Sequence, residues 1–120
     1  MGFLSVFLGG GLGASLRWLV TSKIHYHWGT MVVNVLGALL IGALYGYISS
    51  KTTLRPEIKL FVMTGLLGGF TTFSTYLLDF AMLCEKDNFL EAATYLLLSV
   101  VVGLLVLFAG IRLSSFVFAA

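Results

Sequence analysis

The sequence predicts an all-α membrane protein with four transmembrane helices. Apolar residues make up 59% of the 120-residue chain, charged residues only 10%, and the mean hydropathy is +1.04. A water-soluble protein of this size has too little interior to hide so many apolar side chains. The connections between the apolar runs are short, so we expect one membrane domain over residues 1–120. The net charge of +2, without a basic cluster, gives no indication of a nucleic-acid partner.

Four stretches approach the length of about 20 apolar residues that a helix needs to cross a bilayer. The first lies where a secretory signal peptide would, but it has no basic start and no clear cleavage site, so we interpret it as a retained span. The second and fourth are uncharged, and the third is uncharged until Asp79. We expect the spans at about residues 3–20, 28–50, 60–83 and 92–112.

The basic residues bear on the orientation in the membrane. With four spans, both termini lie on one side, together with the connection that contains "SSKTTLRPEIK". An asymmetry of Lys and Arg between the two sides orients membrane proteins. Here the count is nearly balanced, which favours insertion in both directions and an antiparallel homodimer; a single orientation that the count fails to reveal is the alternative. The first side carries Lys51, Arg55, Lys59 and Arg112, and the other carries Arg17, Lys23 and Lys86.

Glycine pairs with a spacing of four residues occur in three of the expected spans. Four residues return to the same helix face, so each pair allows another backbone to approach closely. The pairs therefore predict a tightly packed bundle, and four short helices are few for a pore, which favours an oligomer. The pairs are Gly9 and Gly13, Gly42 and Gly46, and Gly65 and Gly69.

The third span has a polar, glycine-rich centre, "GGFTTFSTY", at residues 68–76. Paired glycines and paired β-branched threonines are poor helix formers. One interpretation is a broken helix, whose freed carbonyl and amide groups form an ion site inside the membrane. The other is a continuous helix, whose hydroxyl groups bond to carbonyls one turn earlier.

An aromatic pair follows this centre. Phe73 and Tyr76 are three residues apart and share a helix face, and the hydroxyl groups of Ser74 and Thr75 are close by. The edge of an aromatic ring carries partial positive charge, so ring edges beside hydroxyl donors suit a small anion that has lost its water. The alternative is an aromatic pair that packs against lipid or a neighbouring helix.

These segments resemble the Fluc (CrcB) fluoride channels. "GASLRW" in the first span is similar to that family's GAxxRW, "VVNVLGALLIG" in the second to GNxxG, and "TGLLGGFTTFSTY" in the third to GGxTTFST. The resemblance covers nearly the whole chain. It implies an antiparallel, dual-topology homodimer in the cell's inner (plasma) membrane, with the third helix broken at mid-membrane. It also implies two pores through which cytoplasmic fluoride leaves passively, and no enzyme activity.

The resemblance also implies the site residues. A structural sodium ion at the dimer interface would be held by the backbone carbonyls of Gly68 and Thr71. Tyr76 stands where phenylalanine is common in the family, and Gly103 where a hydroxyl is sometimes found. The residues implied along the fluoride path are Arg17, Asn34, Phe73, Ser74, Thr75, Tyr76, Tyr95 and Ser99.

Several residues keep a second interpretation. Asn34 is either a pore-lining amide or an interhelical hydrogen-bonding residue. Arg17 is either a vestibule cation that attracts anions or an anchor whose side chain reaches the membrane interface. Asp79 is either protonated, and then able to donate a hydrogen bond to fluoride, or ionised at the interface. Thr30 is a further candidate to contribute an oxygen near the centre.

Three other functions fit the sequence less well. A small multidrug-resistance type, proton-coupled cation transporter would need a glutamate in the first span, which has no acidic residue. A metal-dependent membrane enzyme would draw on His25 and His27, but two histidines in a loop are a weak metal signal, and we expect both to be solvated. A purely structural subunit leaves the polar centre of the third span without a role. Cys84, the single cysteine, is expected to be a small apolar residue.

Overall fold

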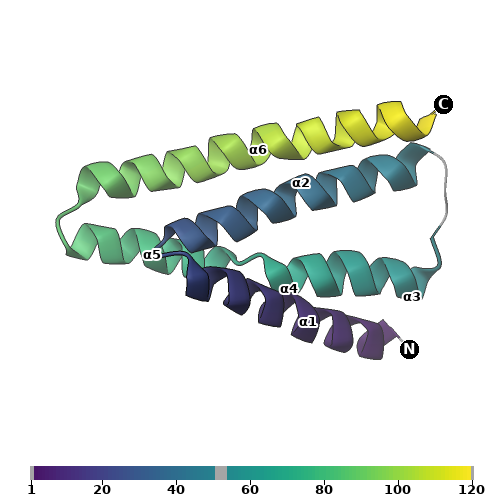
Figure 1. The fold of residues 1–120 in the computed structure, drawn as a ribbon, viewed down its shortest axis with the longest axis horizontal. Coiled ribbons are helices and arrows are strands. Elements are labelled where there is room, and N and C mark those ends of the chain that lie inside the picture. Colours follow the sequence, from purple (N-terminus) through teal and green to yellow (C-terminus); the bar gives the residue numbers. More distant parts are fainter. Residues whose placement is uncertain (1, 51–53, 120) are drawn as a thin grey trace.

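The computed structural model describes residues 2–50 and 54–119, and every regular element in these ranges is helical (Figure 1). The elements in chain order are α1 (Gly2–Lys23), α2 (Trp28–Ser50), α3 (Pro56–Lys59), the π-helix η1 (Leu60–Leu67), α4 (Gly68–Phe70), α5 (Phe73–Glu85) and α6 (Phe89–Ala119).

The four expected apolar spans are confirmed as four stretches of helix long and apolar enough to cross a membrane. The third comprises α3, η1, α4 and α5 and begins at Pro56, whose fixed φ suits the first turn of a helix. The first, third and fourth stretches extend beyond the expected ends of their spans, whereas the second helix, Trp28–Ser50, has the expected bounds. The stretches are Gly2–Lys23, Trp28–Ser49, Pro56–Glu85 and Phe89–Phe118.

Both ends of the chain lie at one end of the bundle, where α2 also ends and α3 begins (Figure 1). The turns at residues 24–27 and 86–88 lie at the opposite end. This is the arrangement expected from four spans. Lys51, one of the basic residues counted for the first end, lies outside the described residues.

The third span changes its packing partner along its length. η1 and α4 pack against α1, whereas α5 packs against α6. The most extensive contact between helices in the described part of the chain is between α2 and α6. The change of partner occurs between α4 and α5, and this is where the candidate site lies.

Glycines bring the helix axes close together in both packed pairs. A Cβ on Gly13 would overlap the Leu66 carbonyl oxygen, and a Cβ on Gly42 would overlap the Leu107 carbonyl oxygen. Backbone approaches backbone at these positions, as the four-residue glycine spacing predicts.

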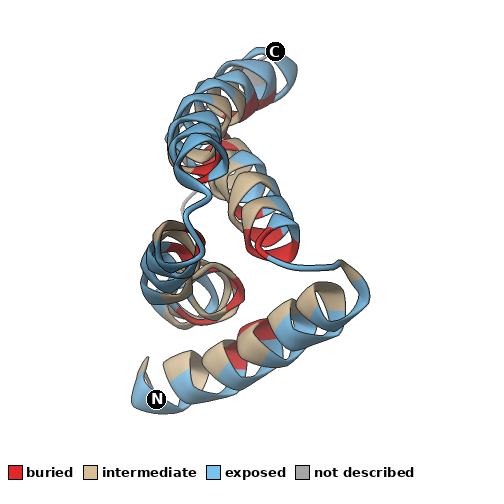
Figure 2. Cartoon of the chain, turned by 90° about the vertical axis from the view of Figure 1, so that its left-hand side faces the viewer, coloured by how far each residue is buried: buried red, intermediate tan, exposed pale blue. Residues whose placement is uncertain are grey.

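Most of the apolar surface faces outward. Figure 2 shows that buried residues form short patches on the helices and that most of the chain is intermediate or exposed. Many large apolar side chains are among the exposed ones. A compact cluster lies between α5 and α6 and contains Tyr76, Leu83, Ala92 and Tyr95, with Cys84 packed against it. Cys84 therefore has the apolar packing role expected from the sequence.

Candidate functional site

The third span is interrupted at two threonines. Thr71 (φ −92°, ψ 160°) and Thr72 (φ −152°, ψ 121°) are extended, whereas α4 ends at Phe70 and α5 begins at Phe73. The Thr72 hydroxyl accepts a hydrogen bond from the Thr75 amide at 3.3 Å, which caps the start of α5. The glycines at 68 and 69 are themselves helical, so the break falls after them.

Asn34 of α2 braces the interruption. Its Nδ2 donates to the Thr72 carbonyl at 3.0 Å, and its Oδ1 accepts from the Thr72 amide at 2.8 Å. The side-chain oxygen thus replaces the helical acceptor that the Thr72 amide loses, and the side-chain NH₂ adds a second donor to the Thr72 carbonyl, which begins α5 as the carbonyl of its N-cap residue. An unpaired backbone group inside a membrane costs several kcal/mol, so this pair of bonds stabilises the break.

Arg17 reaches the same region from α1. Its Nε donates to the Gly69 carbonyl at 3.1 Å, and the side chain is partly buried. In a continuous helix that carbonyl would accept from the Phe73 amide. Arg17 and Asn34 therefore hold the interruption from two different helices.

Two other carbonyls at the break lose their helical donors. The Thr72 amide, which a continuous helix would direct to the Gly68 carbonyl, bonds to Asn34 instead. The Thr75 amide, which would serve the Thr71 carbonyl, bonds to the Thr72 hydroxyl. The Gly68 and Thr71 carbonyl oxygens thus have lone pairs available for another partner.

A groove of about 320 Å³ runs between α2 and the interruption. Polar groups from both sides face it, so it combines an apolar wall with carbonyl and amide groups. Its lining comprises Asn34, Gly37, Ala38, Ile41, Leu67, Gly68, Thr71, Thr72 and Phe73.

The two aromatic residues after the break have different surroundings. The centroids of the Phe73 and Tyr76 rings lie 6.2 Å apart, as their spacing predicts. Phe73 is 71% exposed at the edge of the groove, whereas Tyr76 is 6% exposed. The Tyr76 hydroxyl donates to the Leu96 carbonyl at 2.6 Å, which fixes α5 on α6.

Tyr95 and Asp79 form a polar pair next to Tyr76. Tyr95 is fully buried, and its hydroxyl lies 3.0 Å from Asp79 Oδ2, to which it donates. The Tyr76 and Tyr95 ring centroids are 5.3 Å apart. Thr30 is buried beside the Tyr95 phenol. The Ser99 hydroxyl oxygen, one turn after Tyr95, is buried beside the Tyr76 phenol.

The remaining candidates lie at the margin of this cluster. Ser74 is exposed and Thr75 is half-buried in the first turn of α5. Gly103 faces open space, since a Cβ there would meet no atom within 4 Å. The structure thus brings Arg17, Asn34, Gly68, Thr71 and Phe73 to the interruption, and Tyr76, Tyr95, Ser99 and Asp79 to the interface of α5 and α6.

The expectation for the two histidines is wrong at His27. His25 is exposed, as expected, but His27 is only 7% exposed because its ring packs between Trp28 and Tyr95. Within the described residues no three His, Cys, Asp or Glu side chains gather in a way that could hold a metal ion. The burial of His27 had no sequence signal beyond its neighbouring aromatic residues.

The comparisons with known proteins agree with the motifs at this site. Residues 4–111 match the family model described as CrcB-like protein, Camphor Resistance (CrcB). A protein of Nitrobacter hamburgensis named fluoride-specific ion channel FluC 2 is 42% identical, covering 94% of this chain and 96% of its own. The chain belongs to the CrcB family.

Other relatives extend this match. A Phocaeicola vulgatus protein is 40% identical, covering 93% of this chain and 97% of its own. A Hahella chejuensis protein is 37% identical, covering 93% of both chains. Each is named fluoride-specific ion channel FluC. The CrcB match includes the segments that form the interruption and its braces, so the site lies in the part shared with the family.

Proposed function

We propose that this chain is a fluoride-selective ion channel of the cell's inner membrane that lets cytoplasmic fluoride leave passively. The observation that carries the proposal is the similarity, over nearly its full length, to relatives named for fluoride-specific conduction. The braced break beside an aromatic and hydroxyl cluster supports it. The protein is a channel and not an enzyme.

Fluoride is small and strongly hydrated, so a pore must replace its water with hydrogen-bond donors and still release it. Phe73 and Tyr76 offer ring edges, and Ser74, Thr75 and Ser99 offer hydroxyl groups, of which the Ser99 group is buried. These donors carry no fixed charge, which keeps binding weak enough for release. Asn34 is committed to Thr72 in this chain, so we assign it to the wall of the path and to the break.

The direction of flow follows from the membrane potential. A negative interior drives anions outward by roughly 2.3 kcal/mol per charge per 100 mV. In acidic surroundings fluoride enters cells as neutral HF, which ionises at the higher pH of the cytoplasm. A passive pore for the anion then suffices for export. Arg17, which lies at the interruption and carries the positive charge nearest to it on α1, would attract anions toward the path.

A mid-membrane position of the interruption is part of this proposal. Thr71 and Thr72 lie at the middle of the third span, which is 30 residues long. We further propose that the Gly68 and Thr71 carbonyls bind the structural sodium ion. Hard cations take oxygen ligands, and both oxygens have lost their helical donors. Sodium there would neutralise the carbonyl dipoles and hold two subunits together.

Removal of sodium should therefore weaken the assembly. Na⁺ is exchanged exhaustively for N-methyl-D-glucamine. We then expect the purified protein to lose its dimer peak on size-exclusion chromatography at elevated temperature. Fluoride efflux from liposomes should be lost as well. Addition of Na⁺ should restore both, and addition of Cs⁺ is the control. Unchanged dimer stability in sodium-free buffer would refute the sodium assignment.

We propose that the channel is an antiparallel homodimer. One chain leaves Phe73 and most of its apolar surface exposed, and its basic residues are nearly balanced between the two ends. A second copy inserted in the opposite direction would cover the groove at the interruption and complete two paths.

The topology can be measured with a single thiol. Asn88, exposed in the turn between α5 and α6, is replaced by cysteine in a Cys84→Ser background. In sealed vesicles we expect a membrane-impermeant maleimide to label about half of the chains, because Lys and Arg do not orient them. Detergent, which opens the vesicles, should raise labelling to completion. Labelling of all chains or none before detergent would exclude dual topology.

Growth in fluoride tests the function in cells. A bacterium whose own fluoride exporters have been deleted should regain growth in millimolar-range fluoride when it expresses this chain. Cells that express the Asn34→Asp variant at equal membrane levels should stay sensitive. Failure of the wild-type chain to protect, although it is inserted in the membrane, would count against the proposed function.

A further inference from the structure

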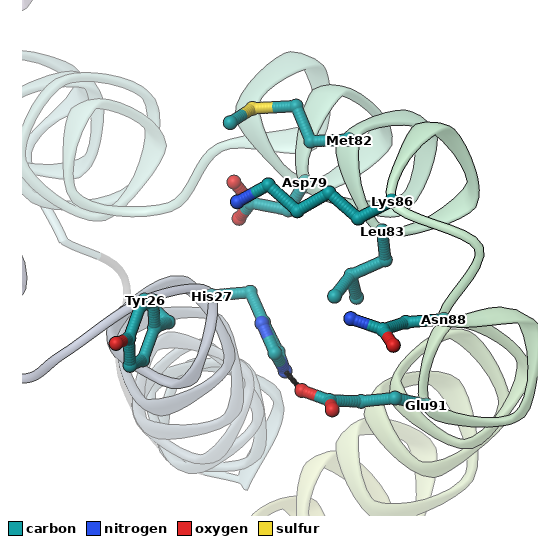
Figure 3. A pocket seen from close by; sticks show the side chains of 8 residues that line it. All are labelled: Tyr26, His27, Asp79, Met82, Leu83, Lys86, Asn88 and Glu91. Carbon is teal, nitrogen blue, oxygen red and sulfur yellow. Dashed lines mark ion pairs between the residues drawn. The ribbon is translucent and has the colours of Figure 1, made fainter.

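A cavity of about 370 Å³ opens at the end of the bundle formed by the turns at residues 24–27 and 86–88 (Figure 3). Ionisable side chains from three elements face it. Figure 3 shows His27 pointing across the cavity toward Glu91, with Asp79 and Lys86 on the opposite wall. The lining comprises Tyr26, His27, Asp79, Met82, Leu83, Lys86, Asn88 and Glu91.

His27 is held in this wall by aromatic packing and one charged neighbour. Its ring centroid lies 4.4 Å from that of Trp28 and 4.5 Å from that of Tyr95. Its Nε2 lies 3.1 Å from Glu91 Oε2, within ion-pair distance, although the geometry is not that of a hydrogen bond. The His27 side chain is 6% exposed and that of Glu91 is 46% exposed, so solvent reaches the pair from the Glu91 side.

A column of rings connects this cavity with the interruption. From the break outward, successive ring centroids are 6.2 Å apart for Phe73 and Tyr76, 5.3 Å for Tyr76 and Tyr95, and 4.5 Å for Tyr95 and His27. Asp79 joins the column to the cavity, because it lines the cavity and accepts the Tyr95 hydroxyl. A charge at His27 thus acts at the outer end of the polar cluster assigned to fluoride.

We propose that His27 and Glu91 form a proton-sensitive charge pair and that this cavity is a mouth of the fluoride path. The charge of the pair then sets how fast fluoride enters through the mouth. The inference rests on the proposed function. The ionisable groups that face His27 are Glu91 and Tyr95 from α6, Asp79 and Lys86 from α5 and its C-terminal turn, and Tyr26 from its own loop.

The sign of the effect follows from these charges. Histidine is the side chain whose charge ordinarily changes between about pH 5 and 8. When His27 is protonated it neutralises Glu91, and Lys86 balances Asp79 on the opposite wall, so the residues that line the cavity carry no net negative charge. When His27 is neutral, one carboxylate stays unbalanced and repels an incoming anion. Charge at the entrance of a narrow site changes entry rates by about tenfold or more.

Fluoride efflux from liposomes over this pH range tests the pair. We expect wild-type efflux to be about tenfold faster at the acidic end than at the basic end. His27→Gln should be slow and flat with pH, and His27→Lys should be fast and flat. His25→Gln, two residues away in the same loop but exposed, is the matched control and should keep the wild-type profile. Liposomes with the Phe73→Ile protein measure the leak of neutral HF, which is subtracted.

Fluorescence of Trp28 provides a readout that needs no transport. A protonated imidazole quenches a neighbouring indole, and the Trp18→Phe background leaves Trp28 as the single tryptophan. We expect the Trp28 emission of the Trp18→Phe protein to change between about pH 5 and 8, and His27→Gln to remove this change.

The outcomes separate the inference from the function on which it rests. Absence of fluoride efflux at every pH overturns the proposed function and this inference with it. Rapid fluoride efflux with a flat pH profile, or with a profile that His27→Gln leaves unchanged, overturns the inference alone. An efflux profile that Glu91→Gln leaves unchanged also contradicts it, because the carboxylate would then not act at the entrance. Trp28 emission that stays constant over this pH range contradicts it as well, because His27 would then not change its charge.

Discussion

Replacement of Phe73 by isoleucine should reduce fluoride efflux to the level of protein-free liposomes. The ring lies at the edge of the groove beside the interruption, 6.2 Å from the Tyr76 ring, and offers its edge to an anion that has lost its water. Isoleucine is apolar but has no quadrupole, so it cannot replace that interaction. Efflux is measured with a fluoride electrode after the vesicles are made permeable to a counter-cation.

The variant should fold and assemble, because Phe73 is 71% exposed in the single chain and makes no hydrogen bond through its side chain. Phe108→Ile is the matched control, since Phe108 is an exposed phenylalanine on α6 away from the groove, and it should conduct as the wild type does. Normal efflux through the Phe73→Ile protein would show that the aromatic positions are misassigned.

Asn34→Asp should also abolish efflux, for two separate reasons. An ionised carboxylate cannot donate to the Thr72 carbonyl, so the 3.0 Å bond is lost and a carboxylate oxygen faces the carbonyl oxygen. Loss of such a bond costs about 1–3 kcal/mol. The new negative charge also repels fluoride at the groove. The measurement is efflux together with thermal unfolding in detergent.

Asn34→Leu distinguishes the two reasons, since it removes both bonds to Thr72 without adding charge. We expect it to unfold at a lower temperature than the wild type, because the Thr72 amide loses its partner and the Thr72 carbonyl loses its side-chain donor. If Asn34→Asp were as active and as stable as the wild type, two claims would be contradicted. These are that Asn34 stabilises the interruption and that it lies beside the anion path.

The sequence predicted the spans well because hydropathy is a local property. Uncharged runs of about 20 residues are sufficient to identify membrane helices, and the glycine spacing indicated where backbones approach. The polar centre of the third span allowed a broken or a continuous helix. The structure shows the interruption at Thr71–Thr72, after the paired glycines and not at them.

The braces could not be predicted because they join distant parts of the chain. Asn34 is 38 residues from Thr72, and Arg17 is 52 residues from Gly69. The residue types alone do not distinguish a lone amide that lines a path from one that hydrogen-bonds the backbone of a broken helix. The break exists because α1 and α2 supply these partners, which is a property of the packed helices.

The expectation that His27 is solvated was wrong for a related reason. A histidine in a short polar loop is usually solvated, and the sequence contains no pattern that distinguishes His25 from its neighbour two residues later. Tyr26 takes a left-handed conformation (φ 61°), which turns the chain between the two histidines. His27 then packs on Tyr95, a residue of α6 that no local pattern could assign to it.

The ratio of fluoride to chloride efflux from the same proteoliposomes tests the central claim most directly. Vesicles loaded with both anions are diluted into an impermeant-anion buffer, and each anion is followed with its own electrode. A passage lined by uncharged donors and ring edges, and too narrow for a larger halide, should release fluoride rapidly and chloride no faster than protein-free vesicles do. Equal release of the two anions, or release of neither, would contradict the account.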